Sequence, residues 1–219
     1  DTSNIEALDR MWVCVELSKR HQDSIDFHEH LLEQDSYSSK AWYNLGHAYS
    51  YEGRYTEAAD AFEYSFLVDE NFEFAYRDCG EICFEVQNFE RALKCYSEVL
   101  DRFEPDTDLH IRIGQCLLSL DFPEKAKRFF QLAIQMDSLA DEAYYHLGEC
   151  LMEAGKYIEA SKNFKQAIRI DDRREEYYSG LAEAYYQLDQ LDKAELHFQT
   201  AIDIAPESTE HWIRLATFL

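Results

Sequence analysis

The sequence predicts an all-α protein, a solenoid of antiparallel helix pairs, because one pattern recurs every 34 residues. The clearest copy begins at Trp42 and has a glycine at Gly46, an alanine at Ala58 and an aromatic residue at Phe62. The small residue returns as Gly80, Gly114, Gly148 and Ala182, and the aromatic residue as Tyr96, Phe130, Phe164 and Phe198. A unit of this length buries its apolar face only by stacking on its neighbours, so the pattern indicates a repeat architecture with one continuous core.

The pattern divides the chain into repeats, which we number in order. Repeat 1, residues 5–38, fits poorly because Trp12 stands where glycine is expected, and this is typical of a degenerate capping repeat. Repeats 2 to 6 are residues 39–72, 73–106, 107–140, 141–174 and 175–208. Residues 209–219 match the first helix of a further repeat, and we expect the natural protein to continue beyond Leu219. The sequence thus predicts a single solenoid over residues 1–219, with about six and a half repeats.

Each repeat is expected to contain a first helix, a short turn and a second helix that packs back on the first. Gly53 and Gly155 mark two of these turns, and Pro123 suits the first turn of a second helix. We expect the glycines of the pattern at the crossing of the two helices, facing the alanines of the second helix. The aromatic residue at Phe62 and its equivalents would then fill the wedge between one repeat and the next.

The motif W-x2-L-G-x2-Y, followed by Ala and then Phe, resembles the tetratricopeptide repeat over nearly the whole chain. The resemblance implies a right-handed superhelix with a concave groove lined by the first helices. It also implies a non-enzymatic protein–protein interaction scaffold or adaptor that binds a peptide segment in this groove. Because a fold does not specify its partner, the partner has to be inferred from the groove residues.

The strong negative charge excludes several classes of partner. The chain has 44 acidic and 21 basic residues, for a net charge of −23, whereas nucleic acids and anionic membranes are bound by clustered Lys and Arg. No apolar run is long enough for a membrane span, and no signal peptide is recognisable. We therefore expect an intracellular, cytoplasmic protein that binds neither nucleic acid nor membranes.

No pattern in the sequence indicates catalysis, a metal site or a cofactor. The six cysteines follow the repeat period, so we interpret them as reduced core residues. Cys79, Cys83 and Cys95 would lack a fourth zinc ligand at a suitable spacing. His28 and His30 are two positions apart and point to different sides of a helix, which favours surface histidines over metal ligands. The sequence therefore predicts no enzyme, no metal and no cofactor.

The resemblance also implies which side chains line the groove. These positions are Tyr43, His47, Tyr51, Arg77, Glu81, Phe84, Ile111, Gln115, Leu118, Tyr145, Glu149, Met152, Glu153, Glu183 and Tyr186. Toward the C-terminal half the groove positions include five carboxylates and no Lys or Arg, namely Glu142, Glu149, Glu153, Glu176 and Glu183. Acidic side chains around aromatic anchors favour a partner peptide that carries basic residues beside apolar ones.

Co-chaperones with this type of repeat grip the C-terminal carboxylate of Hsp70 or Hsp90 with Lys, Asn and Arg side chains. At the matching positions this chain has Tyr43 and His47, then Asp78, then Asp108 and Arg112. Two acids would repel the carboxylate, so this clamp is excluded.

Three other possibilities remain open. The chain could be a regulatory or sensory domain of a larger protein such as a kinase or transferase. Repeats 2 to 4 also loosely resemble the chaperones of type III secretion systems. Finally, the apolar face of the unfinished seventh repeat could pair with a second copy, which predicts weak self-association.

Overall fold

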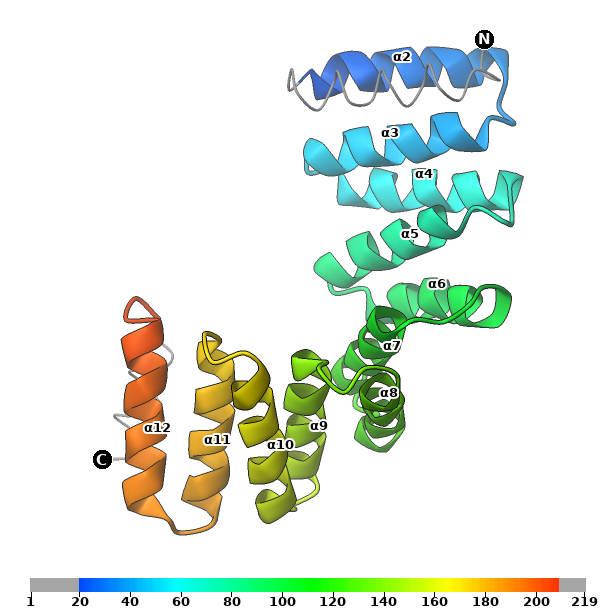
Figure 1. The fold of residues 1–219 in the computed structure, drawn as a ribbon. Coiled ribbons are helices and arrows are strands. Elements are labelled where there is room, and N and C mark those ends of the chain that lie inside the picture. Colours follow the sequence, from blue (N-terminus) through cyan, green and yellow to red (C-terminus); the bar gives the residue numbers. More distant parts are fainter. Residues whose placement is uncertain (1–19, 209–219) are drawn as a thin grey trace. The chain divides into compact units, whose positions relative to one another are not determined.

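The computed structural model describes residues 20–208, and within this range it contains eleven helices and no strand (Figure 1). The helices are α2 (His21–Gln34), α3 (Ser39–Tyr51), α4 (Tyr55–Val68), α5 (Glu73–Glu85), α6 (Phe89–Arg102), α7 (Thr107–Ser119), α8 (Pro123–Met136), α9 (Asp141–Glu153), α10 (Tyr157–Ile170), α11 (Glu175–Gln187) and α12 (Leu191–Ile204). The predicted first helix of repeat 1 and the partial repeat at residues 209–219 lie outside the described residues.

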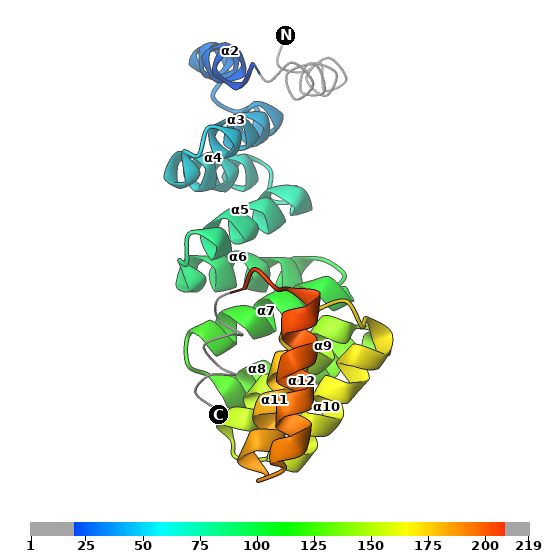
Figure 2. The same cartoon turned by 90° about the vertical axis from the view of Figure 1, so that its left-hand side faces the viewer.

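The chain divides into two compact parts, Asp1–Pro105 and Asp106–Leu219, which we call the N-terminal part and the C-terminal part. Among the described residues the N-terminal part contains α2 to α6, and the C-terminal part contains α7 to α12. Within each part every helix packs on the next one along the chain, as the ribbons of Figures 1 and 2 show. The predicted all-α architecture of packed helix pairs is confirmed. The single solenoid over residues 1–219 stays a prediction.

The first helices of repeats 2 to 6 all end in the same backbone turn. After α3 the amide of Arg54 donates to the carbonyl of Tyr49 at 2.9 Å, which is the hydrogen bond of a Schellman motif. The residue that closes the turn has a positive φ, and it recurs every 34 residues as Gly53 (73°), Gln87 (60°), Asp121 (65°), Gly155 (69°) and Asp189 (58°). Glycine adopts this left-handed conformation without strain, whereas a side chain disfavours it. The turn is thus set by the packing of the helix pair, and glycine at this position only makes it easier to form.

This turn gives a test of local strain. Replacing Gln87 with glycine is expected to raise the free energy of unfolding by about 1 kcal/mol, because it removes a side chain from the left-handed region. Replacing Gly155 with glutamine should lower it by about the same amount. Chemical denaturation followed by circular dichroism measures both changes. If the two substitutions shift stability in the same direction, the turn does not control stability in this way.

The glycines of the pattern lie against aromatic rings of the second helices. A Cβ added to Gly46 would lie 2.6 Å from the ring of Phe62, and one added to Gly114 would lie 2.5 Å from the ring of Phe130. The nearest neighbours of these glycines are thus ring atoms, and the expected contact with the alanines stays a prediction. The physical reason is one of volume, since the ring of the same repeat occupies the space that the missing glycine side chain leaves. The alanines of the second helices are themselves fully buried.

The cysteines and one histidine belong to the core. Cys79, Cys83, Cys95, Cys116 and Cys150 are buried and free, which confirms the prediction of reduced core residues for these five; Cys14 lies outside the described residues. Burial raises the pKa of Cys150 to about 12, with a further contribution from Glu153, so this thiol stays protonated.

His28 corrects the expectation of a surface histidine. Its side chain is buried in α2, and its Nδ1 lies 2.8 Å from the carbonyl oxygen of Ser24. Burial lowers the pKa of His28, so the neutral ring is the favoured form.

Candidate functional site

In the N-terminal part, two predicted groove residues of α3 converge on an acid of α5. The hydroxyl of Tyr43 donates to a carboxylate oxygen of Asp78 at 2.6 Å, and Nε2 of His47 lies 3.1 Å from the same oxygen. The ammonium group of Lys40 lies 5.3 Å from the centre of the Tyr43 ring. Asp78 thus holds the centre of this cluster, and its negative charge disfavours a ligand carboxylate there.

The other predicted residues of the N-terminal part have separate contacts. Arg77 forms an ion pair with Glu73 at 2.7 Å, and Glu81 accepts a hydrogen bond from the hydroxyl of Tyr96 at 3.0 Å. Two further predicted residues make ring contacts: Phe84 meets Phe89 at 5.2 Å between centroids, and Tyr51 stacks on His21 at 4.8 Å. With 53% of its surface exposed, Tyr51 is the most accessible predicted residue of this part.

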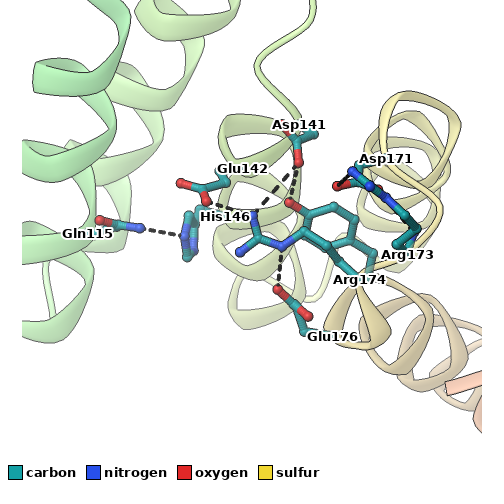
Figure 3. A network of polar contacts seen from close by, with 9 residues as sticks. Gln115, Asp141, Glu142, His146, Asp171, Arg173, Arg174 and Glu176 are labelled. Carbon is teal, nitrogen blue, oxygen red and sulfur yellow. Dashed lines mark hydrogen bonds and ion pairs between the residues drawn. The ribbon is translucent and has the colours of Figure 1, made fainter. Parts of the chain in front are cut away.

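In the C-terminal part a polar chain joins α7 to α9 (Figure 3). The amide nitrogen of Gln115 lies 2.9 Å from Nε2 of His146, and Nδ1 of His146 lies 2.7 Å from a carboxylate oxygen of Glu149. The ring of His146 also stacks on Phe130 of the preceding repeat at 5.3 Å. His146 therefore links two predicted residues, Gln115 and Glu149, although it was not itself among them.

Arg174 is a second residue that sequence reasoning missed. It precedes α11, and its guanidinium group lies 2.7 Å from Glu142 and 2.8 Å from Glu176 (Figure 3). Burial opposes its charge, but the hydrogen bonds to Glu142 and Glu176 raise the pKa of Arg174. Two of the five predicted groove carboxylates are thus already paired with a cation of the chain. The basic pair Arg173-Arg174, which directly precedes the two acids Glu175 and Glu176, was the available signal.

Among the described residues, neither Glu149 nor Glu153 of α9 forms an ion pair with an arginine or a lysine, although Glu149 contacts His146. Glu153 is the last residue of α9, where the helix dipole disfavours negative charge, and Glu149 lies one turn before it on the same side of the helix. None of the first helices α7, α9 and α11 has a basic residue in its last turn. Burial and the nearby charges of Asp121 and Glu149 raise the pKa of Glu153. This end of α9 is therefore a place where added positive charge would be favourable.

The apolar residues predicted for the C-terminal part differ in exposure. Tyr145 is half-buried, because its ring packs against Tyr177 at 5.1 Å and Phe164 at 5.7 Å. Ile111 is only 6% exposed and can offer little surface to a ligand. Leu118 and Met152 are also half-buried.

Two further predicted groove residues lie on α11, namely Glu183 and Tyr186. Tyr186 is 45% exposed, so it is the most accessible aromatic ring among the predicted residues of the C-terminal part. Glu183 accepts a hydrogen bond from Gln187 at 3.0 Å.

Comparison with known families decides the classification. Sequence profiles of the Tetratricopeptide repeat family match residues 139–207 and residues 39–72. The chain is a tetratricopeptide repeat protein. This family forms scaffolds for protein–protein interaction, and that general role is supported for this tetratricopeptide repeat protein. A comparison with curated protein sequences gives no match.

Solved structures of the same fold resemble this tetratricopeptide repeat protein over most of its length. YrrB, described as a TPR protein with an unusual peptide-binding site, is 20% identical with a TM-score of 0.67, over 85% of this chain and 96% of that chain. PilF of Pseudomonas aeruginosa is 14% identical with a TM-score of 0.74, over 97% of both chains. A chain of the APC/C hetero-tetramer Cut9–Hcn1 is 15% identical with a TM-score of 0.71, over 100% of this chain and 43% of that chain. These likenesses confirm the helical repeat solenoid.

Two further observations concern the described residues alone. Between residues 20 and 208, no group of three or more His, Cys, Asp or Glu side chains is arranged to hold a metal ion. In the same range no helix combines the length and the apolar character that crossing a membrane requires.

Proposed function

We propose that this tetratricopeptide repeat protein is an interaction scaffold whose C-terminal part binds a peptide segment carrying Lys or Arg beside an apolar residue. The observation that carries the proposal is the cluster of carboxylates at the end of α9, Glu149 and Glu153, together with the nearby Asp121. A basic side chain placed there would interact favourably with both the carboxylates and the negative end of the helix dipole.

The adjoining first helix α11 supplies the apolar contact. Glu183 and Tyr186 occupy the positions of α11 that correspond to Glu149 and Met152 of α9, one repeat earlier. Because α9 and α11 pack against each other, these residues belong to one surface. Tyr186 offers a partly exposed ring beside the carboxylates, which suits a peptide with alternating basic and apolar residues.

Arg174 pairs with two of the predicted groove carboxylates, so fewer carboxylates are available to a basic ligand than the sequence alone predicts. Glu142 and Glu176 already have a cation, so they add little attraction for a basic ligand. The attractive charges are therefore Glu149, Glu153 and Glu183. On this view charge speeds the encounter and selects a basic partner, while burial of the Tyr186 ring supplies much of the affinity.

Reversing charge at the end of α9 tests the proposal. A fluorescent twelve-residue peptide with alternating Lys and Leu and one Trp serves as the probe. In stopped-flow measurements, Glu149→Lys with Glu153→Lys should reduce its association rate about tenfold and flatten the salt dependence of that rate. The matched control is Asp192→Lys with Glu195→Lys, which changes the net charge equally but on exposed positions of α12. The control should alter the rate less than twofold, because its charges lie away from this surface.

Tyr186→Ala provides the second readout. It should increase the dissociation rate of the same peptide about tenfold, with little effect on association. Tyr145→Ala is a poorer choice, because the Tyr145 ring packs in the core stack with Phe164 and Tyr177. If the α9 and α12 charge reversals have equal effects, binding depends only on net charge and the proposed surface is wrong. The regulatory-domain, secretion-chaperone, self-association and localisation hypotheses stay predictions.

A further inference from the structure

Repeat 3 brings three cysteines together in the N-terminal part, and we call them the thiol cluster. Cys79 and Cys83 lie one turn apart on α5, and Cys95 lies on α6. The Sγ atom of Cys95 lies 3.3 Å from that of Cys79, and Cys79 donates a hydrogen bond to Cys83. All three side chains are buried. The thiols therefore form a chain of contacts that joins the two helices of the repeat.

Packing of the helix pair does not require cysteine at these three positions, as repeats 2, 4, 5 and 6 show. The residues equivalent to Cys79 are Leu45, Ile113, Leu147 and Leu181, those equivalent to Cys83 are Tyr49, Leu117, Leu151 and Tyr185, and those equivalent to Cys95 are Ala61, Phe129, Asn163 and His197. A single buried cysteine often serves only as a small apolar residue. Three thiols in contact, at positions where the other repeats hold none, instead indicate a role for the chemistry of sulfur.

One thiol of the cluster can be reached by a small molecule. Cys95 lines a cavity between α4 and α6 with a volume of about 350 Å³. Leu67, another lining residue, is 64% exposed, so the cavity opens to solvent. Because one water molecule occupies about 30 Å³ in the liquid, the cavity admits a molecule as small as hydrogen peroxide. An oxidant of this size therefore meets the cluster at Cys95.

The contacts within the cluster also supply a thiolate. The hydrogen bond from Cys79 lowers the pKa of Cys83, and the guanidinium charge of Arg91 adds to this effect, whereas burial opposes it. The same hydrogen bond raises the pKa of Cys79. Cys83 is thus the thiol that loses its proton more easily, and the thiolate is the reactive form of cysteine. If Cys79 then passes its proton to Cys83, and Cys95 passes its own to Cys79, the negative charge reaches the sulfur at the cavity wall.

We propose that Cys95 and Cys79 are an oxidation site, at which hydrogen peroxide forms a reversible disulfide between α6 and α5. The Cys95 thiolate attacks one oxygen of the peroxide and breaks the O–O bond, which leaves a sulfenic acid on Cys95 and a hydroxide that takes up the proton lost by the cluster. The sulfur of Cys79 then attacks the Cys95 sulfur, and the departing hydroxide leaves as water with the Cys79 proton. Two thiols thus give up two electrons, and the peroxide becomes two water molecules.

The geometry suits this reaction. The two sulfurs have to approach each other by about 1.3 Å, from 3.3 Å to the roughly 2.0 Å of a disulfide. The bond would close a loop between the two helices of repeat 3 and so restrict the unfolded chain, which stabilises the folded one. The site uses none of the residues of the α9 and α11 surface. The outcome of its test is therefore independent of the proposed peptide binding.

Peptide mapping of the full chain after treatment with hydrogen peroxide tests the site. Remaining thiols are alkylated, and trypsin, which cleaves after Arg77, Arg91 and Lys94, then places Cys95 on a different peptide from Cys79 and Cys83. Mass spectrometry should find these two peptides joined by a disulfide, and dithiothreitol should separate them again. The melting temperature of the oxidised protein should rise by about 5 °C. A peroxide-treated chain in which these two peptides stay separate would overturn the proposal.

Three variants identify the partner of Cys95. Cys79→Leu introduces the residue of repeat 2 and should reduce the cross-link at least tenfold and remove the rise in melting temperature. Cys83→Leu introduces the residue of repeat 4 and should keep the cross-link but slow its formation about tenfold, because the source of the thiolate is lost. The matched control Cys150→Ala removes a buried thiol elsewhere and should change the rate less than twofold. A cross-link that survives Cys79→Leu but disappears in Cys83→Leu would assign the disulfide to the wrong pair.

Discussion

Replacing Phe164 with alanine is expected to lower the free energy of unfolding of the C-terminal part by about 4 kcal/mol. The Phe164 side chain is 1% exposed and lies between two glycines that have no side chain to fill the space it would leave. A Cβ added to Gly148 would lie 2.6 Å from the ring, and one added to Gly180 would lie 2.8 Å from it. Because the walls of the resulting cavity are helix backbone on both sides, they can relax only a little. The expected cost is the middle of the range of about 3 to 5 kcal/mol for phenylalanine truncation.

Guanidinium denaturation followed by circular dichroism measures this loss. Phe122→Ala is the matched control, because Phe122 is in the same part of the chain but is 47% exposed. The control should cost less than about 1 kcal/mol, since little buried apolar surface is lost. Equal losses from the two substitutions would show that the ring of Phe164 is not held between the two glycines.

The sequence predicts this repeat architecture well, because the periodic residues are the ones that packing constrains most. The glycine at Gly148 and the aromatic residue at Phe164 are both visible in the sequence as members of the pattern. The first helices accordingly begin at regular intervals, at Ser39, Glu73, Thr107, Asp141 and Glu175. Sequence spacing does not show which members of the pattern face each other. That pairing depends on the rotation of each helix about its axis, so the contact of Gly148 with the Phe164 ring emerges only in the structure.

The candidate site could be predicted less well than the fold, because it depends on long side chains that reach from one helix or loop to another. Arg174 precedes a helix, and its reach to Glu142 of the previous repeat cannot be read from helix periodicity. Tyr145 shows the opposite problem, since its position in the pattern suggests an exposed groove residue. Its ring is instead covered in part by Tyr177 of the next repeat. Exposure of a groove residue is thus decided by its neighbours in adjacent repeats, whereas its place on the helix is decided by the sequence.

Replacing Gly114 with leucine is expected to destabilise the C-terminal part by about 3 kcal/mol through overpacking. A Cβ at Gly114 would lie 2.5 Å from the ring of Phe130, which is fully buried and cannot move into solvent. Alanine should be tolerated much better than leucine. Ala182 occupies the same position of repeat 6 and is buried there, which shows that the equivalent helix pair of repeat 6 accommodates one methyl group. The higher helix propensity of alanine also offsets about 1 kcal/mol of the destabilisation caused by the added methyl group.

The size of the ring provides the decisive control for this substitution. If the clash with Phe130 causes the loss, shortening that ring in the double variant Gly114→Leu with Phe130→Ala should cost less than the sum of the two single changes. A coupling of about 1 kcal/mol or more is expected for two residues in direct contact, measured by denaturation of all four proteins. Strictly additive losses would mean that leucine disrupts the helix pair by some other route. A Gly114→Leu protein as stable as the parent would show that the small residue of the pattern is not required for the two helices to pack.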